Sequence, residues 1–247
     1  MNAAVIGAGA WGTALACQLS RNGHDTVLWF RSPEKAALAQ ETRVNPRLKN
    51  AVLPPQLLCT ADPQCVRGCG LVVIAAPSFP IRSVCQTVAP YLDESTVMVS
   101  VTKGIEEGSL LRMSQIVAQE TGHKVVALSG PCHAEEVARQ VPTGCLAACD
   151  DRSLAEFVQD AFMSEGFRVY TSPDAVGAEL GGALKNVIAL CAGVVTGLGY
   201  GDNARAALIT RGIAEIARLG VAMGCNIHTF AGLAGIGDLI VTATSMH

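Results

Sequence analysis

The chain has 247 residues and a net charge of −3; half of its residues are hydrophobic and only 16% are charged. This composition predicts a folded protein with one large or two ordinary domains, each with an apolar core. The acidic balance argues against a nucleic-acid partner, because phosphate binding needs a basic face. The ten cysteines show neither a disulfide framework nor zinc-ligand spacing. We therefore expect free thiols, no metal site and a reducing, cytoplasmic location. The amino terminus also lacks the basic region of a signal peptide.

A glycine pattern follows the first predicted strand. Residues 3–6 form a short apolar run, Gly7, Gly9 and Gly12 come next, and residues 13–21 have helical spacing. The order strand, G-x-G-x-x-G, helix is typical of dinucleotide-binding proteins. Gly7 would allow the tight turn, Gly9 the approach of a pyrophosphate, and Gly12 the close packing of helix on strand. The alternative is a coincidental glycine turn.

The second predicted strand, residues 25–30, ends at Arg31 rather than at an acidic residue. An acidic side chain at this place would hold the ribose 2′-hydroxyl of NAD, whereas a guanidinium can bind the 2′-phosphate of NADP. The cofactor prediction is therefore NADP or NAD. The alternative is an exposed arginine that opens the next helix.

Further apolar runs alternate with helical patterns as far as Tyr170. The predicted strands are 71–75, 96–101, 125–129, 143–148 and 167–170, the helices are 81–88, 109–119 and 153–162, and residues 43–55 read as a loop. This alternation predicts an α/β fold with a doubly wound parallel sheet. Lys103 lies just beyond a strand end, where such sheets bind ligands. Because only helical patterns follow, we expect a dinucleotide-binding domain at 1–172 and an all-α domain at 173–247.

The helix predicted after this boundary is almost free of charge. Residues 175–198 contain only Glu179 and Lys185 as charged side chains, and apolar residues fall on all sides. The pattern predicts a helix that is buried all round. A lysine in that setting needs a partner, because burying an unpaired charge is costly.

The surroundings of Lys185 indicate a ligand site. Gly181 and Ala189 share its helix face, so we expect an open floor beside the ammonium. Two alternatives remain: a lysine whose charged end reaches water at a packed edge, and a membrane span. The uncharged run 186–198 is shorter than the ~20 residues that a bilayer needs.

Taken together, the motifs resemble the bacterial type of NAD(P)-dependent sn-glycerol-3-phosphate dehydrogenase. The stretches that carry the resemblance are 7–14, 101–105, 129–137, 181–186, 199–204, 208–212 and 232–239. The resemblance covers the whole chain. The first stretch is generic to dinucleotide-binding proteins, and those beyond residue 172 are far more specific.

The resemblance implies reduction of dihydroxyacetone phosphate to sn-glycerol 3-phosphate with NAD(P)H, which supplies glycerophospholipids, and it implies a homodimer. By the family pattern Lys185 is the catalytic acid–base group. The implied substrate contacts are Lys103, Gly130, Cys132, Lys185, Asp238 and Thr242. The implied cofactor contacts are Gly7, Gly9, Ala10, Trp11, Gly12, Arg31, Lys103 and Ala134. Cys132 stands where the family commonly has serine, and a thiol is a weaker hydrogen-bond partner than a hydroxyl.

The family continues beyond His247 with a Ser-Arg-Asn-Arg motif whose arginine binds phosphate. We therefore expect the helical domain to be incomplete relative to the family and substrate binding to be weaker. A β-hydroxyacid or ketopantoate reductase with a similar two-domain plan is the enzymatic alternative. A nucleotide-binding protein without turnover is the other alternative, which the presence of both Lys103 and Lys185 opposes.

Overall fold

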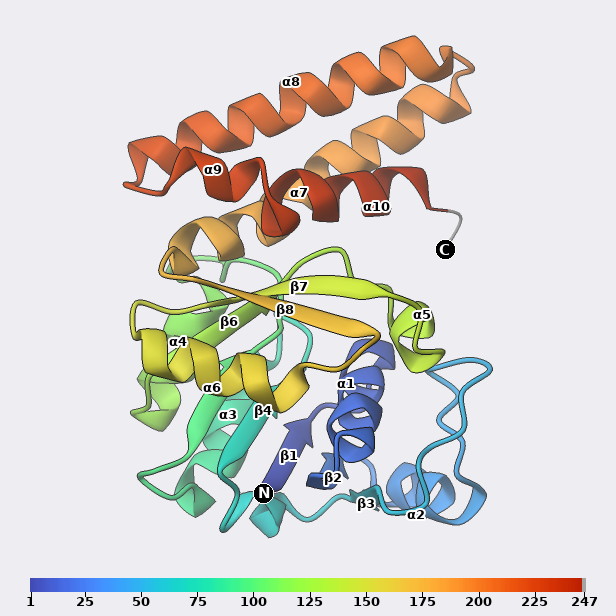
Figure 1. Cartoon of the computed structure of the whole chain (residues 1–247), viewed down its shortest axis with the longest axis vertical. Helices are drawn as coiled ribbons and strands as arrows, with labels where there is room; N and C mark the ends of the chain where they lie inside the picture. The colour runs from blue at the N-terminus through green and yellow to red at the C-terminus, as the bar shows by residue number, and fades with distance from the viewer. Residues whose placement is uncertain (246–247) are drawn as a thin grey trace.

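A computed structural model describes residues 1–245, with a sheet and its helices at one end and a group of helices at the other (Figure 1). Eight strands form one sheet in the order β3-β2-β1-β4-β5-β6-β7-β8. The strands are β1 (Asn2–Ile6), β2 (Asp25–Trp29), β3 (Leu58–Thr60), β4 (Leu71–Ile74), β5 (Val97–Ser100), β6 (Val125–Ser129), β7 (Thr143–Ala148) and β8 (Phe167–Ser172). The predicted doubly wound sheet is confirmed, and the short strand β3 is an addition to it.

The prediction of an all-parallel sheet is wrong at one place. All neighbouring strands from β3 through β2, β1, β4 and β5 to β6 pair in parallel. Strand β7 runs antiparallel to β6, with Ser129 opposite Leu146. The connection between them contains only α5 (Ala134–Ala138). Five helical residues span about 7.5 Å, too little to carry the chain back along a strand for a parallel crossover.

Both faces of the sheet are buried, which explains the continuous apolar runs of its strands. On β4, Leu71 and Val73 join the core on one face, and Val72 and Ile74 join the core on the other. The first core is covered by α1 (Ala10–Arg21), α2 (Pro33–Thr42), α5 and α6 (Arg152–Phe162). The second is covered by α3 (Ile81–Val88), α4 (Met113–Thr121) and the short 3₁₀ turn η1 (Pro63–Val66), with η2 (Ala89–Tyr91) after α3.

Helices follow the last strand. They are α7 (Ala175–Gly197), α8 (Gly201–Ala222), α9 (Ile227–Phe230), the π-helical turn η3 (Leu233–Gly237) and α10 (Asp238–Thr244). Helix α7 begins at Ala175, and the Asp174 side chain accepts a hydrogen bond from the Gly177 amide at 2.9 Å, satisfying a free N–H of the first turn. Beyond its end, α8 folds back along α7 and α10 crosses it (Figure 1).

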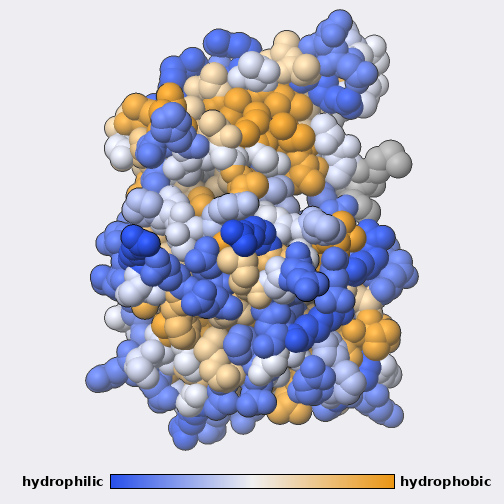
Figure 2. Space-filling view, in the orientation of Figure 1, coloured by the Kyte–Doolittle hydropathy of each residue, from blue (hydrophilic) through white to orange (hydrophobic). Residues whose placement is uncertain are grey.

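The prediction that this helix is buried all round is wrong. Its first half is buried against the sheet and η3, but Val187, Leu190 and Val194 are each more than half exposed. Figure 2 shows apolar side chains gathered over this helical end of the molecule. The apolar composition of α7 therefore corresponds to burial only in the first half of the helix.

Two stretches, Ala175–Gly197 and Ile227–Thr244, are long and apolar enough to cross a membrane by length and composition alone. The first carries Lys185 and Glu179, both buried and both ion-paired within the protein. The second is divided into α9, η3 and α10. Neither stretch is therefore a clear membrane span.

Candidate active site

Lys185 lies at the middle of α7 and faces α10. Its Nζ is 2.5 Å from Oδ1 of Asp238 and 2.6 Å from Oγ1 of Thr242, which lie one turn apart on α10. The Lys185 side chain is 8% exposed. The alternative in which its ammonium reaches water is therefore wrong, and the partner that a buried lysine requires is Asp238.

A second lysine reaches the same carboxylate from the sheet. Lys103 follows β5, and its Nζ lies 2.5 Å from Oδ2 of Asp238 and 3.4 Å from the carbonyl oxygen of Gly130. Asp238 is 1% exposed, while Lys103 remains 28% exposed. One carboxylate thus lies between two ammonium groups, and the trio carries a net positive charge. The site is suited to an anionic ligand or to an oxygen that gains negative charge.

The surroundings of Lys185 alter its acidity. Burial away from water and then the nearby Lys103 ammonium lower the pKa of Lys185 to about 8, and the Asp238 carboxylate opposes them. A pKa near neutrality allows one group both to hold and to release a proton at working pH.

The loop after β6 forms the side of the site next to Lys103. Gly130 has a φ of +152°, and a Cβ there would lie 2.9 Å from Cα of Cys145, so only glycine fits. Cys132 is half-buried, and its thiol contacts the carbonyl oxygen of Gly144 on β7 at 3.8 Å. The predicted substrate contacts Lys103, Gly130, Asp238 and Thr242 thus meet around Lys185, and Cys132 lies beside them.

The small residues on α7 have a different role from the predicted one. A Cβ on Gly181 would lie 2.4 Å from the Ala234 carbonyl oxygen, and one on Gly182 would lie 3.1 Å from Oγ of Ser129. Gly181 therefore allows η3 to pack on α7, and the interpretation that it leaves a floor open for a ligand is wrong. Of the two lysines, Lys103 is the more exposed and the more accessible to a ligand from solvent.

Gly7, Gly9 and Gly12, in the turn between β1 and α1, have different surroundings, and each matches its predicted role. Gly7 has a φ of +123°, and a Cβ on it would lie 2.6 Å from the Ala75 carbonyl oxygen. A Cβ on Gly12 would lie 2.0 Å from the Gly7 carbonyl oxygen, so the helix packs directly on the turn. A Cβ on Gly9 would meet no atom within 4 Å. The turn therefore leaves open space at Gly9, in front of the N-terminus of α1, where a pyrophosphate fits.

The other predicted cofactor residues lie at the same edge of the sheet. Ala10 and Trp11 begin α1, and Ala134 begins α5, which packs on α1. Arg31 is exposed and lies two residues beyond the end of β2. The residues present fit a dinucleotide that runs from Arg31, across Gly9, toward Lys103.

Sequence reasoning missed Asn45, which supports the glycine turn. Its amide is buried and donates to the Ala8 carbonyl oxygen at 3.0 Å and to Oγ1 of Thr13 at 2.7 Å. The sequence around it shows only Asn45-Pro46 in a predicted loop. An asparagine before proline predicts a turn equally well with its side chain in water, so no local signal identified this contact.

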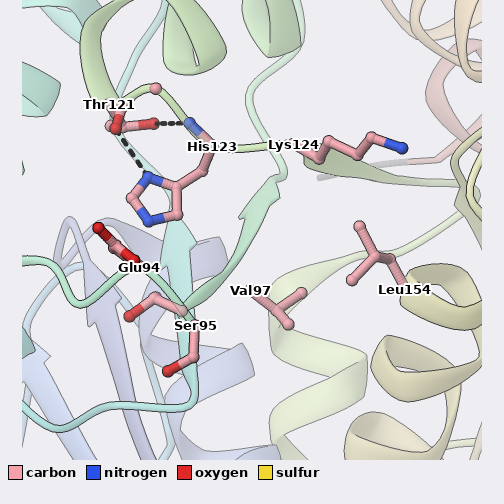
Figure 3. Close-up of a pocket in the computed structure, with 9 residues that line it drawn as sticks. Glu94, Ser95, Val97, Thr121, His123, Lys124 and Leu154 are labelled. Atoms are coloured by element: carbon pink, nitrogen blue, oxygen red, sulfur yellow. Dashed lines mark hydrogen bonds between the residues drawn. The ribbon is translucent and has the colours of Figure 1, made fainter.

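Two surface hollows lie away from these residues. One, of about 460 Å³, lies where β5 and β6 begin, and Figure 3 shows Glu94, His123 and Lys124 around it. The other, of about 270 Å³, lies near Asp25 and Arg67. Both are at the amino ends of strands, whereas parallel sheets of this kind bind ligands at the carboxyl ends. Among residues 1–245, no cluster of histidine, cysteine or carboxylate side chains could hold a metal ion.

Family models match both ends of this architecture. Residues 2–155 match the N-terminal model of NAD-dependent glycerol-3-phosphate dehydrogenase, and residues 174–247 match its C-terminal model. The chain belongs to the NAD-dependent glycerol-3-phosphate dehydrogenase family. The resemblance found in the sequence motifs is thereby confirmed.

Individual relatives agree with this assignment. The glycerol-3-phosphate dehydrogenase [NAD(P)+] of Moorella thermoacetica is 53% identical over 246 residues, which cover 99% of this chain and 73% of the relative. The crystal structure of glycerol-3-phosphate dehydrogenase from Coxiella burnetii is 37% identical, with a TM-score of 0.94 over 99% of this chain and 76% of that one. A ketopantoate reductase from Ralstonia eutropha has a TM-score of 0.61 at 17% identity, with 98% of this chain and 96% of that one covered. That likeness shows the fold alone.

Proposed function

We propose that this chain reduces dihydroxyacetone phosphate to sn-glycerol 3-phosphate with NAD(P)H, and catalyses the reverse oxidation. The observation that supports the proposal most directly is Asp238 held between the ammonium groups of Lys103 and Lys185. A dehydrogenase of this family needs one proton donor for the carbonyl oxygen and positive charge for an anionic substrate. The two lysines meet both needs.

Lys185 acts as the catalytic acid. Reduced nicotinamide, when bound, supplies the hydride. Hydride transfer leaves an alkoxide on the substrate, which the Lys185 ammonium stabilises and then protonates. In the reverse direction the neutral amine takes the proton from the hydroxyl. A pKa of about 8 makes both forms available near neutral pH.

Asp238 and Thr242 orient the acid. Lys185 donates to Oδ1 of Asp238 and to Oγ1 of Thr242, and the Thr242 hydroxyl donates to the Asp238 backbone carbonyl at 2.8 Å. The third ammonium hydrogen has only a long contact, with Nζ 3.5 Å from the Asp238 backbone carbonyl oxygen, and this contact can give way to the substrate oxygen. Lys103, more exposed, binds substrate and cofactor, together with Gly130 and Cys132.

The nucleotide extends from Lys103 across Gly7, Gly9 and Gly12 to Arg31. We expect Arg31→Asp to weaken NADPH binding more than NADH binding, because the new carboxylate repels a 2′-phosphate and accepts hydrogen bonds from a 2′-hydroxyl. Dissociation constants from fluorescence titration of both cofactors measure this. Arg21→Asp changes the same charge elsewhere and is the control. Equal weakening of both cofactors by Arg31→Asp would contradict the placement.

Steady-state turnover tests the function. The chain should oxidise NADPH or NADH in the presence of dihydroxyacetone phosphate, and not with ketopantoate. Turnover of ketopantoate alone would favour the reductase alternative. NADPH binding without turnover of either substrate would favour a nucleotide-binding role.

The remaining expectations accompany this function. We propose a boundary between a dinucleotide-binding domain at 1–172 and a helical domain at 173–247, a cytoplasmic location, a homodimer and supply of glycerophospholipid synthesis. All ten cysteines are free thiols, which supports a reducing compartment. Light scattering should give a mass near twice 25.6 kDa; a monomer mass at micromolar concentration would contradict the dimer.

A further inference from the structure

The most exposed large apolar side chain in the described part of the chain is Phe79, at 98%. It lies in the loop between β4 and α3, within a turn in which the Ile81 amide donates to the Ser78 carbonyl oxygen at 3.4 Å. A ring with this exposure adds almost nothing to the apolar core. Because single exposed apolar residues are common on protein surfaces, the place of Phe79 in the fold has to decide what it does.

The loop of Phe79, residues 75–80, lies at the place where doubly wound sheets bind dinucleotides. Strands β1 and β4 are neighbours, and each continues into a helix on a different face: α1 covers one core and α3 covers the other. The chain therefore diverges at the carboxyl ends of these two strands, and a dinucleotide lies across such a switch point. The glycine turn after β1 forms one side of the switch point, and residues 75–80 form the other.

The start of this loop packs on the glycine turn. The Ala75 amide donates to the Ile6 carbonyl oxygen at 2.9 Å. A Cβ on Gly7 would lie 2.6 Å from the Ala75 carbonyl oxygen, and one on Gly12 would lie 2.9 Å from Cβ of Ala75. The loop is therefore fixed against the turn that leaves space for a pyrophosphate.

The same loop contacts the strand end that carries Lys103. The Thr102 hydroxyl donates to the Ala76 carbonyl oxygen at 2.7 Å. Gly104 has a φ of +149°, and a Cβ on it would lie 2.9 Å from Cβ of Ser78. The residues on both sides of Lys103 thus touch the loop, and the second contact is made by the residue directly before Phe79.

We propose that Phe79 packs its ring against one of the two flat rings of bound NAD(P)H, adenine or nicotinamide. Its loop contacts both the glycine turn and the strand end at Lys103, between which the dinucleotide extends. Stacking needs a flat partner and no particular hydrogen-bond pattern, so Phe79 serves NADH and NADPH alike. Phe79 therefore adds affinity for the cofactor, whereas Arg31 discriminates between its two forms.

The experiment measures cofactor binding to the full chain by calorimetry, without substrate. Phe79→Ala should raise the Kd for NADPH at least about fivefold, because the flat ring loses its aromatic stacking partner. The Kd for NADH should rise by the same factor, unlike the unequal effect expected of Arg31→Asp. The Tm of the free protein should not change, because the Phe79 side chain is almost fully exposed.

Three further variants separate stacking from other effects. Phe79→Trp keeps a flat ring and should retain the wild-type affinity for NADPH, whereas Phe79→Leu keeps an apolar side chain and should lose most of it. Tyr200→Ala is the matched control, because it removes an exposed aromatic ring at the turn between α7 and α8 and should leave the Kd unchanged. An unchanged Kd with Phe79→Ala or with Phe79→Leu would overturn the proposal, as would a lower Tm of the free Phe79→Ala protein.

A fragment of the cofactor identifies the ring. Adenosine 2′,5′-bisphosphate contains the adenine and the 2′-phosphate of NADPH and lacks the nicotinamide. If Phe79→Ala weakens this fragment and NADPH by the same factor, the partner of Phe79 is adenine; if it weakens NADPH alone, the partner is nicotinamide. All of these measurements are made without substrate. A chain that binds NADPH and does not turn over dihydroxyacetone phosphate would contradict the proposed function, and the dissociation constants would still decide the role of Phe79.

Discussion

At the scale of single residues, Asp238 determines how the two lysines share the site. It touches Lys185 through one carboxylate oxygen and Lys103 through the other, at 2.5 Å each. The carboxylate favours the charged form of Lys185, whereas burial and the Lys103 ammonium disfavour it. The acidity of the proposed catalytic group is thus set by two neighbours with opposite effects.

Substitutions of Asp238 and of Lys103 should move the pH profile of kcat in opposite directions. Reduction needs protonated Lys185, so kcat for reduction should fall as pH rises through about 8. Asp238→Asn removes the opposing charge, lowers the pKa of Lys185 and moves this decline to lower pH. Lys103→Met removes a like charge and moves it to higher pH. The profiles are measured with saturating substrate and cofactor; movement of both variants in the same direction would contradict the assignment.

At the scale of elements, α7 packs against the N-terminus of α4 through a second buried charge, the carboxylate of Glu179. Glu179 accepts hydrogen bonds from the backbone amide and hydroxyl of Ser114, at 2.8 and 2.6 Å, and pairs with Arg112. Ser114 lies in the first turn of α4, so the carboxylate also satisfies the positive end of that helix. This contact fixes the part of α7 that precedes Lys185.

We expect Glu179→Gln to lower the free energy of unfolding by about 2 kcal/mol, because a buried charge pair loses one partner. That loss corresponds to a decrease of roughly 4–8 °C in Tm for a chain of this size. Glu215→Gln is the matched control, since its pair with Arg218 on α8 is exposed and should contribute less than ~1 kcal/mol. Urea denaturation measures both variants, and equal midpoints would show that the Glu179 contacts contribute little.

Sequence reasoning located the elements better than their contacts. The strands from β1 to β8, apart from β3, and the helix α7 follow from apolar runs, which are local signals. The direction of β7 depended on the length of α5, and the exposure of Val187 and Leu190 depended on which helices cover α7. Gly181 was interpreted as ligand space because spacing shows which face a residue shares, and not what packs on that face.

At the scale of the whole molecule, cofactor binding and stability are linked. A ligand that binds only the folded chain adds about 2.7 kcal/mol of stability when its concentration is 100 times Kd. The glycine turn, Asn45 and α5 come from distant parts of the sequence, so they form a binding surface only in the folded protein. A rise in Tm with NADPH therefore reports the integrity of this end of the molecule.

Gly9→Ala separates binding from folding. A Cβ at Gly9 meets no atom within 4 Å and its φ is −71°, so the free protein should keep its Tm. The added methyl group occupies the space assigned to the pyrophosphate, and the rise in Tm with NADPH should fall by at least half. Gly193→Ala, also in open space but on α7, should keep the full rise. A full rise with Gly9→Ala would place the cofactor elsewhere.

We propose that Lys185 gives the proton to the substrate oxygen, and Lys185→Met removes this proton donor. Methionine keeps the apolar packing of α7 and removes the ammonium, while Lys103 continues to pair with Asp238. The measurement is kcat for reduction of dihydroxyacetone phosphate from pH 6 to 10, with NADPH affinity measured in parallel. We predict a fall in kcat of at least ~10², with loss of the decline near pH 8 and almost unchanged NADPH affinity. A kcat close to that of the wild type at every pH would contradict the claim and make Lys103 the candidate acid.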